Sequence, residues 1–237
     1  MVSKNLSRNS QTSIIFLTNA TIRIYIRKAI LFITWILIAF FVYGMGIVSI
    51  LTPATREAAL PMTPIALLLT TAVLLFFART VYTRRMILVF IAIALIGFLV
   101  ELVGVQTGWI FGHYRYTSNF GVCWWGTPPL IGINWLFLSY AWAAVLQNTA
   151  SAPVHRIVYA ALGMLAYDLL LEQAAPRMQL WYWEKGNIPF SNYIAWFVLA
   201  LFFQWLIRRN RIVTQNNMAL PLLLLQIVLY ISVILYI

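Results

Sequence analysis

Long apolar runs separated by short polar segments make up most of the chain. Seven of them are long enough, or nearly long enough, to cross the hydrocarbon core of a bilayer, which is about 30 Å thick. They are 29–51, 64–78, 86–105, 130–147, 157–171, 193–206 and 218–237. A backbone in lipid must satisfy its own hydrogen bonds, and the runs lack the alternation of barrel strands. The pattern predicts an all-α fold, an integral membrane bundle of about seven transmembrane helices.

Composition and charge agree with lipid as the solvent of this chain. Of 237 residues, 63% are hydrophobic and only 9% are charged, whereas charged residues approach a quarter of an ordinary soluble domain. The net charge of +11 does not indicate a nucleic-acid partner, because the basic residues lie in short clusters between the apolar runs. Twelve of the sixteen Lys and Arg fall before the first run and in the alternate loops that follow it. This asymmetry predicts a cytoplasmic N-terminus, in a protein of the cytoplasmic membrane.

The same asymmetry divides the chain into parts. Residues 1–28 are predicted to be a basic cytoplasmic arm, and residues 29–237 a single transmembrane helical domain. An odd number of helices then places the C-terminus on the outer face. The loops 106–129 and 173–192 are predicted to lie on that outer face as well.

The acidic residues are few, and three of the five fall inside or at the ends of predicted spans: Glu101, Asp168 and Glu172. A rise of about 1.5 Å per residue places them about 18 to 24 Å from the cytoplasmic ends of their helices, so all three belong to the outer half. Asp168 and Glu172 share one helix face at a spacing of four residues. Glu101 shares a face with glycines, which permit close helix approach; these are Gly97, Gly104 and Gly108.

These acids are predicted to form a buried carboxyl cluster that lines a cavity, because ionisable groups inside a membrane are costly and mark functional sites. Two carboxyls close together in a low dielectric hold at least one proton at neutral pH, and that proton is available for chemistry. The alternative is that each acid reaches the interface or forms an ion pair. Its partners would then be Arg115, Arg177 or Lys185.

Two predicted outer loops are dense in aromatic residues beside single charged groups. The residues are Trp109, Tyr114, Tyr116, Trp181, Tyr182 and Trp183. They form either an interfacial belt or the lining of a pocket. Glycines in the first of these loops suggest that it bends back into the protein. Pro128-Pro129 is predicted to start the fourth helix, and Ser191-Asn192 offers an N-cap for the sixth.

Several chemistries are disfavoured by what the sequence lacks. His113 and His155 fall on opposite sides of the predicted membrane, so a His-rich metal site cannot be assembled from them. No lysine lies in the last span, which argues against a retinal Schiff base, and no phosphate loop or nucleotide fingerprint occurs. We therefore expect no metal site, no retinal and no nucleotide.

Several motifs, in the order in which they occur along the chain, resemble those of a known protein family. The first is Glu101-x-x-Gly104-x-x-Thr107-Gly108-x-x-Phe111-Gly112-x-Tyr114-x-Tyr116. It is followed by Gly126-x-Pro128, by Asp168, by Trp181-x-Trp183-Glu184 and by Pro189-x-Ser191-Asn192-x-x-x-Trp196. From about Gly97 to Trp196, the chain resembles the membrane carotenoid 1,2-hydratase family of carotenoid biosynthesis proteins.

The resemblance implies addition of water to the terminal isopropylidene double bond of an acyclic carotenoid end group, without a cofactor. Acid chemistry fits: a carboxylic acid protonates the alkene, aromatic faces shelter the tertiary cation, and a water captures it. Asp168 is the expected proton donor, with Glu101 or Glu172 as its partner or as the base for water. The expected substrate-binding residues are Trp109, Tyr114, Tyr116, Trp181, Trp183, Asn192 and Trp196.

Two alternatives remain at this point. A membrane lycopene-type cyclase protonates the same end group but traps the cation with a neighbouring alkene. A non-catalytic carotenoid-binding or transport protein would use the acids to gate ions and the aromatics to hold a polyene. The expected partners are a carotenoid substrate and the lipid bilayer, and other enzymes of the carotenoid pathway are candidate partners.

Overall fold

The computed structural model describes residues 2–149 and 152–237, with side chains from residue 22 onward in those ranges. The chain divides into two units, 1–42 and 43–237. Helix α1, Val2–Leu51, is continuous across that boundary and also across residue 28. Its segment Ile22–Leu51 has a mean hydropathy of 2.4 and is long enough to span a membrane. The separation of a basic arm 1–28 from the first span stays a prediction.

The second unit holds the remaining helices. They are α2 (Pro53–Ala59), the 3-10 turn η1 (Leu60–Met62), α3 (Thr63–Phe76), α4 (Arg84–Thr107), α5 (Leu130–Val145), α6 (Pro153–Ala174), α7 (Phe190–Arg209) and α8 (Ala219–Tyr236). Six helical segments of the described residues are long and apolar enough to span a membrane, and α5 is a shorter apolar helix. The predicted all-α membrane bundle of about seven helices is therefore confirmed.

Two helical segments begin earlier than predicted, because each begins at a proline that the prediction left outside it. The second span begins at Pro53 rather than at residue 64, since Pro53, Pro61 and Pro64 each stand in the first turn of a helical segment, where no backbone N–H is needed. The fifth predicted span, 157–171, corresponds to α6, which begins at Pro153 for the same reason. By contrast, Pro129 caps α5 at Leu130, as the Pro-Pro pair predicted.

Helices α4 and α5 pack closely because glycines remove side chains from their contact. A Cβ on Gly132 of α5 would lie 2.2 Å from the Ala94 carbonyl oxygen of α4. A Cβ on Gly97 of α4 would lie 2.7 Å from Cδ1 of Trp135. Of the glycines predicted to share a face with Glu101, Gly97 thus gives α5 close access to α4, whereas a Cβ on Gly104 or Gly108 would meet Phe111 or His113 of the following loop.

A short antiparallel sheet joins the two aromatic loops. Sequence periodicity did not predict this sheet. Strand β1 (Tyr114–Tyr116) pairs with β2 (Trp181–Trp183) in the register Tyr114↔Trp183 and Tyr116↔Trp181. Before β1, Gly108 ends α4 with φ 68°, a left-handed conformation that favours glycine. The first loop therefore turns back over the helices, and a second 3-10 turn, η2 (Ser118–Phe120), follows the strand.

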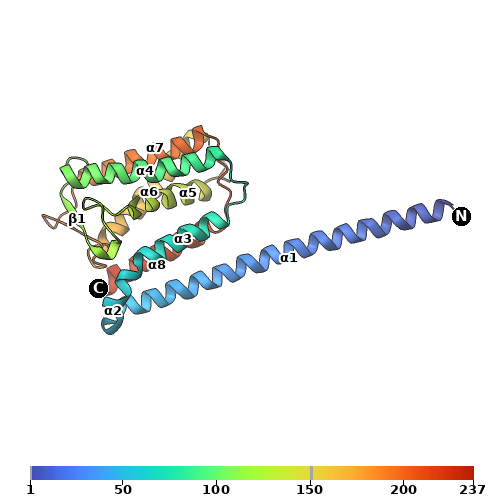
Figure 1. Ribbon diagram of the computed structural model, residues 1–237, viewed down its shortest axis with the longest axis horizontal. Coiled ribbons are helices and arrows are strands. Elements are labelled where there is room, and N and C mark those ends of the chain that lie inside the picture. The colour runs from blue at the N-terminus through green and yellow to red at the C-terminus, as the bar shows by residue number, and fades with distance from the viewer. Residues whose placement is uncertain (1, 150–151) are drawn as a thin grey trace. The chain divides into compact units, whose positions relative to one another are not determined.

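The bundle of the second unit has two distinct ends. One end, which we name the cap end, carries the sheet, the C-terminal ends of α4 and α6, the start of α7 and the C-terminus (Figure 1). The opposite end, named the basic end, carries the α3–α4, α5–α6 and α7–α8 connections. Both aromatic loops and Ile237 thus share one end. Which end faces the cytoplasm stays a prediction.

Candidate functional site

The three carboxyls predicted to gather inside the bundle are buried. Asp168 and Glu172 lie one turn apart on α6 and are 0% and 3% exposed, and Glu101 on α4 is 2% exposed. We name these three residues the carboxyl cluster. Helix α6 carries its two acids on the face that packs against α7, because Asn192 of α7 contacts both of them. None of the three carboxyls therefore reaches water in the manner of a snorkelling side chain.

Glu101 accepts hydrogen bonds from three aromatic side chains. The hydroxyls of Tyr114 and Tyr116 on β1 both donate to Oε2, the second at 3.1 Å. The Trp135 indole N–H of α5 donates to Oε1 at 3.2 Å. Burial, followed by the charge of Glu101, raises the pKa of Tyr114 and of Tyr116 well above the ordinary value of 10.0. Both phenols therefore remain donors, and both oxygens of Glu101 are satisfied.

Glu172 is held by donors from the second strand and from α7. Its Oε2 accepts from the indole N–H groups of Trp181 at 3.2 Å and Trp183 at 2.8 Å. Its Oε1 accepts from Nδ2 of Asn192 at 3.2 Å. Glu172 and Glu101 thus have the same environment, in which each oxygen faces N–H or O–H donors that suit an ionised carboxylate.

Asp168 has a different environment from its two neighbours. Its Oδ2 accepts only a long contact, 3.5 Å, from the same Asn192 amide nitrogen. Its Oδ1 is fully buried and has no hydrogen-bond partner among the described residues. A buried polar atom without a partner is rare and demands an explanation. Among the described residues, Asp168 is thus the member of the carboxyl cluster with an unpartnered oxygen.

Aromatic contacts tie the carboxyls together across the cap. The Tyr114 ring lies 4.9 Å from the Trp183 ring, which joins the donors of Glu101 to those of Glu172. The Trp135 ring stacks on Trp196 of α7 at 4.1 Å. The sheet register is what brings these groups together, since it sets tyrosines of one loop directly opposite tryptophans of the other.

Most of the residues that the sequence singled out lie around the carboxyl cluster. Those in contact with it, or stacked on its donors, are Tyr114, Tyr116, Trp181, Trp183, Asn192 and Trp196. Trp109 is not brought into this group: its side chain is 86% exposed. Tyr182 and Arg115 point the other way from the sheet, because strand neighbours alternate between faces.

Two local expectations are corrected. Helix α7 begins at Phe190 after an N-cap at Pro189, so Ser191-Asn192 is not the N-cap. Asn192 instead lies inside the helix, where its amide spans the two acids of α6. The proposed ion pairs with Arg115, Arg177 or Lys185 are also wrong, since the partners of the three carboxyls in the described chain are aromatic and amide donors.

Trp135 is a hydrogen-bond partner of the carboxyl cluster that sequence reasoning missed. It is fully buried in an apolar helix, where tryptophan is an ordinary core residue. Its N–H was the available signal, because a buried indole needs an acceptor and Glu101 is among the few acids of the chain. Among the described residues, no group of three or more His, Cys, Asp or Glu is arranged to hold a metal ion.

The match to a known protein family extends over this site. The sequence profile of a family described as "Carotenoid biosynthesis protein" matches residues 62–237. A bisanhydrobacterioruberin hydratase of Haloarcula japonica is 29% identical over 122 residues, which cover 48% of this chain and 41% of that protein. The chain thus aligns with less than half the length of this relative. No solved structure matches it.

Proposed function

This chain belongs to the carotenoid biosynthesis protein family, and from that premise we propose that it is a carotenoid hydratase. In this proposal it is a hydro-lyase that adds water to the terminal isopropylidene double bond of an acyclic carotenoid end group, with no cofactor. The name of the Haloarcula japonica relative, a hydratase, supports this reaction class. The buried carboxyl cluster at the cap end supports the choice of acid chemistry.

One observation carries the assignment of roles: among the described residues, Asp168 alone of the three acids has a carboxyl oxygen without a donor. Glu101 and Glu172 are surrounded by N–H and O–H groups, which favour the ionised form of a carboxylate. Asp168 has an unpartnered oxygen and one long contact, so little stabilises its ionised form through hydrogen bonds. We therefore assign Asp168 as the protonated acid that donates to the substrate.

The reaction then balances without an added reagent. Asp168 transfers its proton to the CH carbon of the double bond, and the carbon that bears two methyl groups becomes a tertiary cation. A water molecule adds to that cation, and its surplus proton passes to the Glu172 carboxylate. Asn192 holds Glu172 beside Asp168, so this proton returns to Asp168 and restores the acid. The sum is the addition of one water.

The surrounding groups would stabilise the cation between these steps. Aromatic faces attract a cation through their quadrupole, and the paired rings of Tyr114 and Trp183 lie between two carboxyl sites. Glu101, ionised and held by Tyr114, Tyr116 and Trp135, contributes a negative charge that cannot move toward the cation and collapse onto it. The cation would therefore persist until a water molecule adds to it.

Asp168→Asn is the direct test, with Glu184→Gln as the matched control. Glu184 is an exposed acid at the end of β2, outside the carboxyl cluster. Each variant is expressed in cells that make an acyclic carotenoid, and pigments are identified by chromatography with mass detection, normalised to folded protein. We expect the wild type and Glu184→Gln to add the mass of one water per reacted end. Asp168→Asn should lose about 10²- to 10⁴-fold of this product, the usual contribution of a general acid.

Each of the other outcomes would contradict part of the proposal. An undiminished yield from Asp168→Asn excludes Asp168 as the acid. A product of unchanged mass but new mobility indicates a cyclase, in which an alkene captures the cation. Unchanged pigment that remains bound to the purified wild-type protein indicates a carotenoid-binding or transport protein.

A further inference from the structure

The charges of this chain are separated along the bundle. Its five acids are Glu57, Glu101, Asp168, Glu172 and Glu184, in α2, near the C-terminal ends of α4 and α6, and after β2, all toward the cap end. The connections at the basic end contain no acidic residue in the sequence. They and their flanking helix ends carry arginines at positions 79, 84, 85, 156, 208, 209 and 211. A ligand at the basic end would therefore meet positive charge only.

A cavity of about 500 Å³ opens at this end among α5, α6 and α7. We name it the basic cavity. It lies beside the end of α5, because α6 extends farther toward the basic end: Gly163 of α6 faces Trp142 of α5, and beyond that contact α6 continues for about 15 Å to Pro153, whereas α5 ends at Val145. Helix α7 ends about level with α5, since Gln204 of α7 bonds to the Ser139 carbonyl of α5. The recess below the last turn of α5 thus lies near the boundary between lipid acyl chains and headgroups.

The lining of the basic cavity is divided between charge and apolar surface. Arg156, Arg208 and Arg211 line it together with Gln147 and Thr214. Arg156 is positioned by bonds to the backbone carbonyls of Gln147 at 2.8 Å and residue 149 at 2.6 Å. Thr214 donates to the Gln147 side chain at 2.9 Å, which ties the α7–α8 connection to the end of α5.

The apolar part of the lining comes from helix ends on both sides. Ile157 of α6, Ile207 of α7 and Val213 contribute to it. Free phosphate would use the arginines but not this apolar wall. An amphiphile with a phosphate headgroup would use both, and basic pockets between transmembrane helices are known to bind such headgroups.

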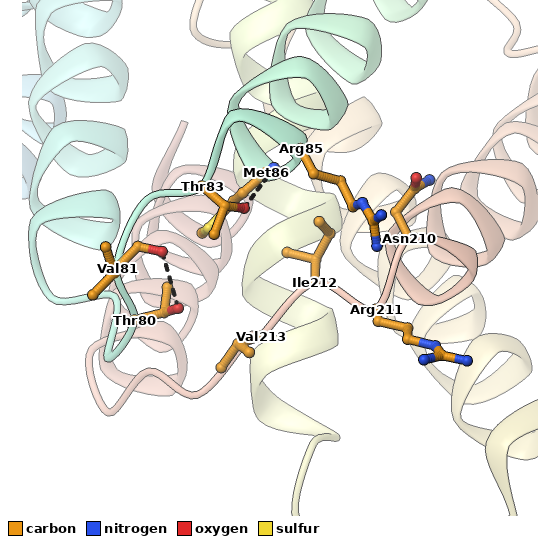
Figure 2. A pocket seen from close by; sticks show the side chains of 9 residues that line it. All are labelled: Thr80, Val81, Thr83, Arg85, Met86, Asn210, Arg211, Ile212 and Val213. Atoms are coloured by element: carbon orange, nitrogen blue, oxygen red, sulfur yellow. Dashed lines mark hydrogen bonds between the residues drawn. The ribbon is translucent and has the colours of Figure 1, made fainter.

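A smaller cavity continues the same basic surface beyond the α7–α8 connection. It has a volume of about 270 Å³ and shares Arg211, Ile212 and Val213 with the basic cavity. Figure 2 shows Arg85 of α4 extending toward the segment that carries Asn210 and Arg211. A headgroup beside Arg211 therefore has basic side chains on both sides of that segment.

We propose that the basic cavity binds the phosphate headgroup of an anionic membrane lipid, with an acyl chain against its apolar wall. Two features carry this: the recess beside the end of α5 and its three arginines in an acid-free end of the bundle. The proposal is independent of the chemistry at the cap end. It gives the bundle a lipid ligand in the leaflet opposite the carboxyl cluster.

The test compares two double variants of the full chain that each remove two exposed arginines. Arg208→Gln/Arg211→Gln removes cavity residues, and Arg84→Gln/Arg209→Gln removes the same charge from residues that line neither cavity. Purified proteins in detergent receive phosphatidylglycerol, phosphatidylcholine or inorganic phosphate at equal concentration, and retained ligand is counted by native mass spectrometry. Equal melting temperatures of the two variants establish equal folding.

We expect the wild type and the control variant to retain phosphatidylglycerol in preference to phosphatidylcholine. The cavity variant should lose about 10- to 30-fold in retention, from about 1 kcal/mol for each arginine near a lipid surface. Arg208→Lys/Arg211→Lys should recover most of it. Equal retention by both double variants, equal retention of both lipids, or displacement of phosphatidylglycerol by inorganic phosphate would each overturn the proposal.

Discussion

Gly97 is the position at which a single methyl group should disturb the site from a distance. In Gly97→Ala the new Cβ would lie 2.7, 2.8 and 2.9 Å from Cδ1, Cγ and Cβ of Trp135. The Trp135 ring has little room to retreat, because it is fully buried, stacks on Trp196 at 4.1 Å and meets Phe203 edge-on at 5.4 Å. The ring must therefore shift sideways, and its N–H bond to Glu101 must lengthen.

The expected magnitude follows from these two contributions. Overpacking a filled core by one methyl group costs about 1–3 kcal/mol. Loss of a hydrogen bond to a charged acceptor adds about 1.5–3 kcal/mol, so Gly97→Ala should destabilise the protein by about 2.5–6 kcal/mol. Gly46→Ala is the matched control, since Gly46 also lies in a membrane-spanning helix but has nothing within 4 Å of its added Cβ. That substitution should be neutral or stabilise by up to about 1 kcal/mol.

A double-mutant cycle measures whether the clash with Trp135 is the cause. Unfolding of the purified protein in detergent is followed for Gly97→Ala, Trp135→Ala and the double variant. Because Trp135→Ala removes Cδ1 and Cγ, the two nearest of the three clashing atoms, Gly97→Ala should cost less in that background, with a coupling energy of about 1–3 kcal/mol. Equal costs of Gly97→Ala in both backgrounds would refute the reasoning, as would a cost no larger than that of Gly46→Ala.

Two further predictions concern the donors of the carboxyl cluster. Asn192→Leu keeps the side-chain volume but removes the amide between the two α6 carboxyls, so the yield of hydrated pigment per folded protein should fall about 10-fold or more; an unchanged yield would exclude a positioning role. Because burial raises the pKa of Tyr114 and of Tyr116 well above 10.0, both should stay protonated at pH 10, where the unfolded chain begins to ionise. Stability should therefore fall as the pH rises above 10, and replacing both with Phe should leave the tyrosinate absorbance of the folded protein near pH 10 unchanged.

The acids show how far local reasoning reaches. Their rarity, their positions inside apolar runs and the spacing of Asp168 and Glu172 are properties of short sequence windows, and they correctly predicted burial on one helix face. The partners of these acids are not local. Glu172 is satisfied by tryptophans that follow its helix, and Glu101 by a tryptophan 34 residues away. The rarity of acids also suggested ion pairs with basic residues, and that alternative is wrong. A short sequence window does not show which donors will lie beside a buried carboxyl in the folded chain.

The short elements were beyond sequence reasoning for a different reason. Strands of three residues are too brief for period-two alternation to be recognised, and Trp181-Tyr182-Trp183 has the composition of an interfacial belt as much as of a strand. Asn192 was placed correctly near the site but in the wrong local role, because Pro189 rather than Ser191 ends the loop.

The sequence alone determined the solvent of this protein, the number and approximate position of its helices, and which carboxyls lie buried among them. These follow from hydropathy and spacing, which act over one or two helical turns. Tertiary structure decided which donors hold each carboxyl, that Asp168 keeps one oxygen without a partner, and that a basic recess lies beside the last turn of α5 at the opposite end. Those features depend on the register between segments far apart in the chain, and packing sets that register only when the helices meet.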